Sequence, residues 1–127
     1  MHSLVGSDSV HTTAAICDYL DDRLSPGDTV TVVAVASTTD PTARRDCQDA
    51  LNAASVRLTA TASVDTRLCN GDPAAVLLEA AAETDPDEIV VGSHGWHSDE
   101  SQPVGATVET ILERANRPAV VVPTSTE

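Results

Sequence analysis

Runs of β-branched and aliphatic residues alternate with segments of helical periodicity, and this alternation constrains the fold more than any other feature. The clearest runs are residues 28–36 (DTVTVVAVA), 88–93 (EIVVGS) and 119–122 (AVVV), which are apolar on both faces as strands covered on both sides are. Residues 1–6 form a shorter candidate. Residues 63–69 alternate polar and apolar side chains, which favours a half-exposed strand at a sheet edge.

Four segments with helical spacing separate these strands. Three of them follow helix-start signals, namely Ser7-Asp8-Ser9, Asp40-Pro41 and Asp72-Pro73. The apolar residues expected on their inward faces are Ile16, Cys17, Leu20, Leu24, Ala43, Cys47, Ala50, Leu51, Ala54, Leu58, Val76, Leu77, Ala80, Ala81, Val108, Ile111, Leu112 and Ala115. The β-α-β-α-β-α-β-α-β order predicts an α/β fold in one domain, residues 1–127, with a parallel sheet and helices on both faces.

The charge balance limits the classes of partner. Acidic residues outnumber basic ones by 20 to 7, the net charge is −13, and every basic residue is an arginine. Such a chain repels nucleic acid and anionic membranes, so neither is expected as a partner. The acidity suits either a specific cationic partner or a surface solvated in a very salty cytoplasm. The even spread of carboxylates and the absence of lysine favour the second interpretation and resemble the proteins of extreme halophiles.

The chain also lacks targeting and redox signals. No signal peptide opens it, and no apolar run approaches the roughly 20 residues that span a bilayer. The three cysteines, Cys17, Cys47 and Cys69, have no CxxC spacing and are expected to be reduced thiols. A cytoplasmic location is therefore expected.

The segment VVGSHGWHSDESQPVGATVETI, residues 90–111, holds the strongest candidate site. Gly92, Gly95 and Gly105 give the spacing G-x2-G-x9-G between a strand and a helix. Glycines let a backbone approach a ligand closely, and the free amides at a helix N-terminus attract anions. In a parallel sheet this loop and residues 6–9 are expected at the same carboxyl edge, where ligands bind.

Longer stretches around these glycines carry a resemblance. The segments IVVGSHGW, G-x-x-x-E-x-I and RPAVVVP, with RLCNGDPAAVLLEAAAETDPDEIVVGSHG upstream, resemble the universal stress protein family. LVGSDSVHTTAAICDYL matches the first strand and helix of that family more loosely. The resemblance implies a five-stranded parallel sheet in order 3-2-1-4-5, of the adenine nucleotide alpha hydrolase-like type. The family has two subfamilies. One binds ATP through G-x2-G-x9-G followed by Ser or Thr, and the other lacks this motif and does not bind ATP.

Carried over position by position, the resemblance implies phosphate contacts at Gly92, Gly95 and Gly105. The Ser or Thr that follows in the family falls on Ala106, which has no hydroxyl group. Thr107 lies one position later and roughly 100° around the helix, so it is an imperfect substitute.

The resemblance also implies where the nucleoside would lie. The family's Asp at the end of the first strand falls on Ser7, with Asp8 one residue later, and the residues that flank adenine fall near Ala34 and Val35. Trp96 stands where family members often carry a basic residue. The sequence leaves open whether Trp96 stacks on a base, blocks the pocket, contacts a partner or rests on the domain.

Charge in the loop opposes a triphosphate. Asp99 and Glu100 would repel phosphates within about 4–6 Å unless Mg²⁺ or Mn²⁺ bridges them or molar KCl screens them. His94 and His97 are three residues apart, but no third ligand has a motif-like position, so no metal site is expected from them. Lysine is absent and no G-x-S-x-G elbow occurs, so no catalytic residues are assigned and at most slow ATP hydrolysis is expected.

Two functions remain open from the sequence. The first is a stress-response regulatory module that binds ATP, or another adenine nucleotide, at Ser7, Asp8, Val35, Gly92, Gly95, Gly105, Ala106 and Thr107. The second is a universal stress protein that binds no nucleotide and acts as a dimeric interaction protein. Both predict a homodimer through the last strand, Ala119–Val122. The resemblance implies pairing through this strand, and its apolar edge is one that water should not face.

Overall fold

The structure is a computed structural model, and it describes residues 1–94, 96 and 104–124. Its strands are β1 (His2–Ser7), β2 (Thr29–Ala36), β3 (Ser63–Asn70), β4 (Glu88–Gly92) and β5 (Ala119–Val122). Its helices are α1 (Val10–Asp21), α2 (Pro41–Leu58), α3 (Pro73–Thr84) and α4 (Ala106–Arg114). The strands form one parallel sheet in the order β3-β2-β1-β4-β5, which confirms the predicted α/β fold and strand order.

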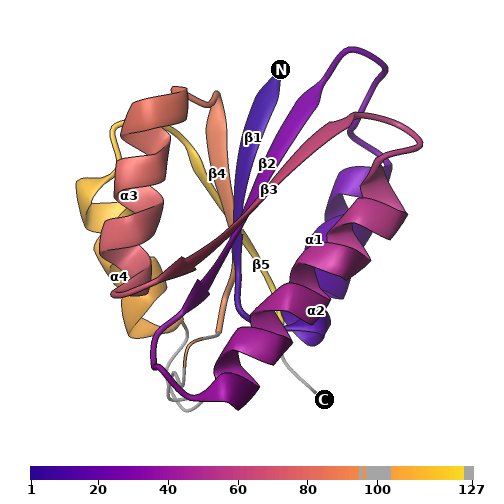
Figure 1. The fold of residues 1–127 in the computed structure, drawn as a ribbon. Helices are drawn as coiled ribbons and strands as arrows, with labels where there is room; N and C mark the ends of the chain where they lie inside the picture. Colours follow the sequence, from indigo (N-terminus) through magenta and orange to yellow (C-terminus); the bar gives the residue numbers. More distant parts are fainter. Residues whose placement is uncertain (95, 97–103, 125–127) are drawn as a thin grey trace.

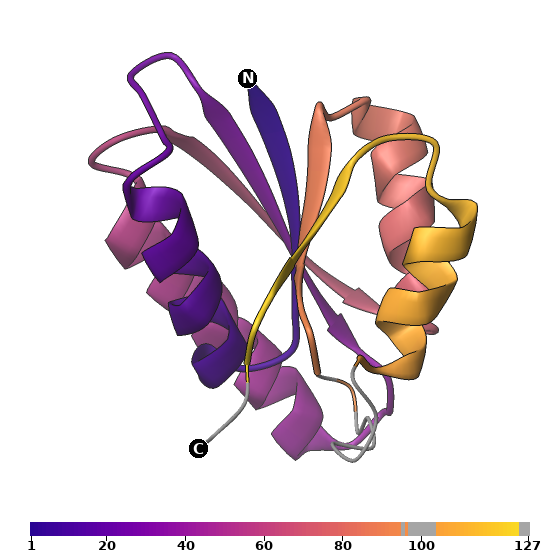
Figure 2. The ribbon, with the colours of Figure 1, turned by 180° about the vertical axis from the view of Figure 1, so that it is seen from behind.

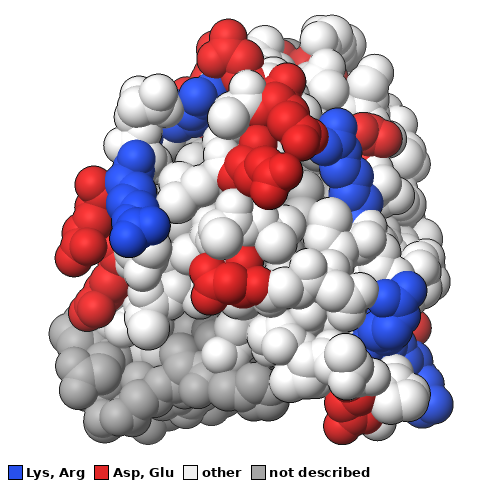
Figure 3. Space-filling view, turned by 60° about the vertical axis from the view of Figure 1, so that its left-hand side comes forward, with Lys and Arg blue, Asp and Glu red and all other residues white. Residues whose placement is uncertain are grey.

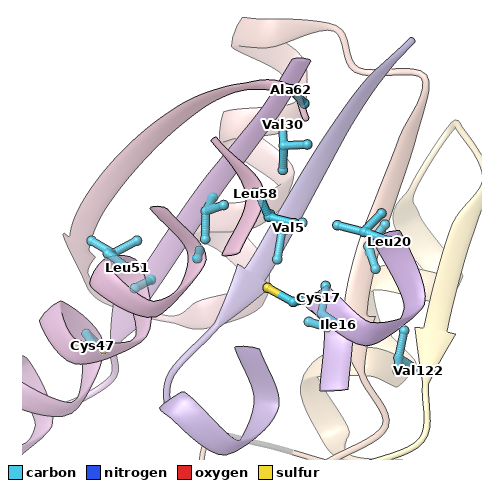
Figure 4. Packing of buried hydrophobic residues seen from close by; sticks show 14 of the residues in the cluster. Val5, Ile16, Cys17, Leu20, Val30, Cys47, Leu51, Leu58, Ala62 and Val122 are labelled. Carbon is cyan, nitrogen blue, oxygen red and sulfur yellow. The ribbon is translucent and has the colours of Figure 1, made fainter. Parts of the chain in front are cut away.

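The helices cover the two faces of the sheet in pairs, α1 with α2 and α3 with α4 (Figures 1 and 2). Strand alternation explains this arrangement, because successive side chains point to opposite faces. In β2, Val30 and Val32 pack with the α1 and α2 residues, whereas Val33 and Val35 belong to the cluster under α3 and α4. Figure 4 shows the first of these clusters, with Ile16 and other aliphatic side chains between helix and sheet.

Helix starts follow the predicted caps. Ser9, Asp40 and Asp72 each have extended backbone, and each side chain accepts a hydrogen bond from a backbone N–H two or three residues later. Each of these bonds satisfies one of the amides that a helix leaves unpaired at its start. The fourth helix differs, because α4 begins after Gly105 and has no side-chain cap.

One expectation about the C-terminal region was wrong. Leu112, expected on the inward face of α4, is 52% exposed, whereas Val108 and Ile111 are buried. The helix lies at the margin of the sheet, against α3 and β5, so its covered face is too narrow to include Leu112. Thr124, just after β5, is only 5% exposed.

The order of the strands in the sheet indicates where a ligand would bind. β1 pairs with β2 on one side and with β4 on the other, so the chain order reverses between β1 and β4. Ligands of open parallel sheets bind at the carboxyl edge beside such a reversal. Within the described residues, no helix combines the length and apolarity that a bilayer crossing requires.

Candidate functional site

A cavity of about 350 Å³ lies at the carboxyl ends of β1 and β2, beside the start of α2. Its lining residues are Asp8, Ser9, Val35, Ala36, Ser37, Thr38, Asp40, Thr42, Ala43, Asp46, Cys47 and Trp96. Its volume falls in the range of small-molecule sites, and it lies at the carboxyl edge of the sheet beside the reversal between β1 and β4. The lining combines aliphatic and aromatic side chains with hydroxyl groups and carboxylates, which suits a ligand that is part aromatic and part polar.

The end of β1 presents Asp8, and not Ser7, to this cavity. Ser7 is fully buried, and its hydroxyl group lies 2.9 Å from Thr13 Oγ1 and donates to Ser9 O at 3.1 Å. The Asp8 carboxylate lines the cavity and accepts a hydrogen bond of 2.8 Å from the Trp96 backbone N–H. The single-residue offset from the family position therefore separates a structural Ser7 from a cavity-facing Asp8.

Trp96 joins the end of β2 to the loop after β4. Its indole Nε1–H donates to the Val35 carbonyl oxygen at 2.8 Å, and its ring packs against the apolar cluster under α3 and α4. Its φ angle is +50°, a left-handed conformation that costs a non-glycine residue about 1–2 kcal/mol. The two hydrogen bonds and the ring packing compensate for this cost, so Trp96 is held in a defined position.

Two of the motif glycines contact other parts of the protein itself, Gly92 by close packing and Gly105 by a backbone hydrogen bond. A Cβ added to Gly92 would lie 2.6 Å from Thr124 Cγ2 and 2.8 Å from Thr12 Cγ2. The Gly105 N–H donates to Ser93 O at 2.8 Å, and its φ of −75° and ψ of 164° suit any residue. Side-chain packing therefore explains Gly92, whereas the backbone angles of Gly105 do not require glycine.

The remaining predicted phosphate contacts lie at the start of α4. Ala106 is exposed and Thr107 is half-buried at the first two helical positions, while Gly95 lies outside the described residues. Neither Ala106 nor Thr107 lines the cavity at β1 and β2. The structure thus brings Asp8, Val35 and Trp96 together, and it leaves the α4 start outside this lining.

The cavity is acidic. Asp8, Asp40 and Asp46 line it, and its described lining contains no arginine or histidine. Burial raises the pKa of the Cys47 thiol to about 11, so this wall is a neutral thiol at physiological pH, not a nucleophile. The local charge therefore opposes a ligand with several negative charges placed directly in this cavity.

No metal centre is formed by the part of the chain that the structure describes, where no three His, Cys, Asp or Glu side chains converge. His94 Nδ1 lies 3.3 Å from Ser93 Oγ. His97, Asp99 and Glu100, considered from the sequence, lie outside the described residues. The residues in view thus supply no complete set of ligands for Mg²⁺ or Mn²⁺.

Sequence reasoning missed Thr124, which ties the end of β5 to the loop after β4. Its Oγ1 accepts from the His94 N–H at 3.0 Å and donates to His94 O at 3.1 Å, and its N–H donates to Ser93 Oγ at 3.0 Å. Its carbonyl oxygen also lies 3.1 Å from His11 Nε2. No periodic signal marks a threonine after the last strand, so only the sheet topology reveals this connection.

Sequence reasoning also missed the cavity residues that α2 and its cap supply, among them Asp40 and Asp46. A signal was present, because Asp40 was read as the cap of α2 and Asp46 follows within two turns of the same helix. A helix that starts after β2 must begin at the carboxyl edge of the sheet. Its first residues therefore belong beside any ligand site at that edge.

These features define a class: a doubly wound parallel α/β protein with a ligand-sized cavity at the carboxyl ends of its central strands. Residues 4–123 match the model of the Universal stress protein family. The chain belongs to that family. Comparison with curated protein sequences gives no significant match.

Solved structures share this fold at low sequence identity. The hypothetical protein MJ0577 is 16% identical with a TM-score of 0.84, over 99% of this chain and 97% of that one. The universal stress protein of Archaeoglobus fulgidus in complex with dAMP is 19% identical with a TM-score of 0.69, over 96% and 97%. A family member of Arabidopsis thaliana with AMP bound is 14% identical with a TM-score of 0.64, over 99% and 93%.

Proposed function

We propose that this protein binds an adenine nucleotide at the carboxyl edge of its sheet and serves as a nucleotide-responsive module in stress responses. The observation that carries the proposal is the cavity between Asp8, Val35 and Trp96, at the carboxyl ends of β1 and β2 and beside the reversal of strand order between β1 and β4. Family membership and the dAMP and AMP bound to two structures of the same fold support it.

The nucleoside has a suitable environment in the cavity. The Val35 carbonyl is an acceptor for an exocyclic amino group, and the Asp8 carboxylate is an acceptor for hydroxyl groups. We place the phosphates toward Gly105, Ala106 and Thr107, because α4 has no side-chain cap and the dipole of a helix start favours an anion.

The negative charge of the cavity favours nucleotides with fewer phosphates. A monophosphate brings fewer negative charges toward Asp8, Asp40 and Asp46 than ATP does. ATP binding by the G-x2-G-x9-G loop therefore requires Mg²⁺ or Mn²⁺ on its phosphates or the screening of molar salt. The cation would neutralise phosphate charge, and the protein would supply the base contact and the helix start.

Titration calorimetry with AMP, and with ATP in the presence and absence of Mg²⁺, tests the proposal in molar KCl. Thr42→Trp places a bulky ring at the cavity wall, and Gln48→Trp is the matched control on an exposed part of the same helix. We expect micromolar AMP binding that Thr42→Trp weakens about tenfold or more and Gln48→Trp leaves unchanged. Equal binding by both variants would place the nucleotide elsewhere.

A second candidate function is a dimeric interaction protein that binds no nucleotide. Specific observations favour it: the Trp96 indole already bonds to the Val35 carbonyl, and three carboxylates line the cavity. Under this alternative, no nucleotide gives heat in any buffer. The dimer would then be the functional form.

We also propose a homodimer through β5, under either function. The strand lies at the end of the sheet, and Ala119, Val120 and Val121 are only partly buried. An exposed apolar edge strand is a template for a second chain, and an added lysine blocks such pairing. Analytical ultracentrifugation should show a dimer that Ala119→Lys dissociates and that Thr66→Lys, on the opposite edge strand β3, leaves intact. A monomeric parent at micromolar concentration would contradict this.

A further inference from the structure

The Val35 carbonyl, near the carboxyl end of β2, has no hydrogen-bond partner from a neighbouring strand. Along a strand, successive backbone groups point to alternate neighbours, and the Ala36 carbonyl accepts from the Gly71 N–H on the β3 side. The Val35 carbonyl therefore points to the β1 side. The register of β1 with β2 ends at Ser7 opposite Ala34, so β1 supplies no strand partner at that level.

The Trp96 side chain donates a hydrogen bond to the Val35 carbonyl. Its indole offers a planar aromatic ring with one N–H donor, and that N–H lies 2.8 Å from Val35 O. An adenine ring with its amino group presents the same combination of flat face and donor. The backbone N–H of Trp96 is held at the same time by the Asp8 carboxylate at 2.8 Å, so the residue is anchored from β1 as well as from β2.

We propose that Trp96 is an intramolecular competitor for the base subsite, so that nucleotide binding exchanges the indole for the base at the Val35 carbonyl. This inference rests on the proposed nucleotide function and adds how that site is regulated. The hydrogen bond between the Trp96 indole and the Val35 carbonyl lowers the apparent affinity for the nucleotide, because only molecules in which this bond is broken can bind the base. Nucleotide occupancy is then reported by the position of one side chain on the loop after β4.

The first experiment compares AMP affinity by calorimetry in the parent, Trp96→Ala and Trp96→Phe proteins. Trp96→Ala removes the competing ring and donor, so we expect about tenfold tighter binding, the effect of one net hydrogen bond and the packing of one ring. Trp96→Phe keeps a ring without the N–H and should fall between the two. Leu112→Ala, which truncates an exposed apolar side chain on α4, is the control and should bind as the parent does.

The second experiment uses fluorescence, because Trp96 is the only tryptophan. Excitation of the indole and quenching by neutral acrylamide report its exposure in the full chain. We expect quenching to increase as AMP saturates the parent, since the indole leaves Val35.

The outcomes separate this inference from the proposed function. Weaker AMP binding by Trp96→Ala would show that the ring stacks on the ligand, and equal binding would show that Trp96 does not compete. Either result overturns the inference and leaves nucleotide binding intact. Absence of binding in the parent and all variants overturns both.

Discussion

At the scale of single residues, Gly92 shows how packing accounts for a position that the motif assigns to a ligand. The residue ends β4 in ordinary backbone geometry, and the methyl groups of Thr12 and Thr124 occupy the space where a side chain would begin. Both threonines are buried, so neither can move away freely. A glycine is therefore required here whether or not a phosphate binds.

We predict that Gly92→Ala destabilises the fold. The added methyl group should lower the free energy of unfolding by about 1–3 kcal/mol, the usual cost of overpacking a core. Combining Gly92→Ala with Thr12→Ser and Thr124→Ser removes both opposing methyl groups and keeps both hydroxyl groups. Chemical denaturation should show that the alanine costs far less in this serine background than in the parent. An equal cost in both backgrounds would contradict the packing explanation.

At the scale of elements, local signals decide where helices begin. Asp72 caps α3 by accepting a hydrogen bond of 3.0 Å from the Ala75 N–H, and Pro73 occupies the first turn. We expect Asp72→Ala to lower the free energy of unfolding by about 1 kcal/mol, because the capping bond is lost. Asp72→Asn keeps an acceptor and should cost much less. Denaturation curves that show the same loss for both substitutions would assign the effect to charge and not to capping.

The elements were largely predictable because their signals are local. Periodicity and caps placed the strands and most helix faces, and the edge position of β3 followed from its alternating pattern. Contacts between distant segments were not predictable in the same way. The bond from Trp96 to Val35 and the burial of Thr124 depend on how loops after different strands meet at the carboxyl edge. No spacing in the sequence encodes that meeting.

The candidate site was likewise predictable only in part. The sequence pointed to Asp8 and Val35 through the family resemblance, and both line the cavity. It could not separate Ser7 from Asp8, because a one-residue offset at the end of a strand moves a side chain to the other face. The buried hydroxyl of Ser7 and the cavity-facing carboxylate of Asp8 show the outcome of that alternation.

At the scale of the whole molecule, charge is the dominant feature. The net charge of −13 is spread over the surface, and Figure 3 shows carboxylates scattered among neutral side chains on one face. Several arginines are paired, as Arg57 is with Asp18 and Asp21. The 20 acidic residues still outnumber the seven arginines, so the carboxylates of the folded state repel one another, and salt screens this repulsion.

We propose that this surface is an adaptation to high salt, and thermal stability tests it. The melting temperature should rise as KCl increases from low to molar concentration, because the Debye length falls to about 3 Å at 1 M and the repulsion fades. Choline chloride at equal ionic strength is the control for screening alone. A melting temperature that does not depend on salt would reject the adaptation.

The proposed function and the proposed role of Trp96 both require that an adenine nucleotide reaches the Val35 carbonyl at the carboxyl edge of the sheet. The most direct measurement is the indole N–H resonance of Trp96 during an AMP titration in molar KCl, because one tryptophan gives one such signal. We predict a saturable shift of this resonance, because the hydrogen bond to Val35 is lost, with the same midpoint as the calorimetric heat. An indole signal that stays unchanged while AMP saturates the protein would contradict it.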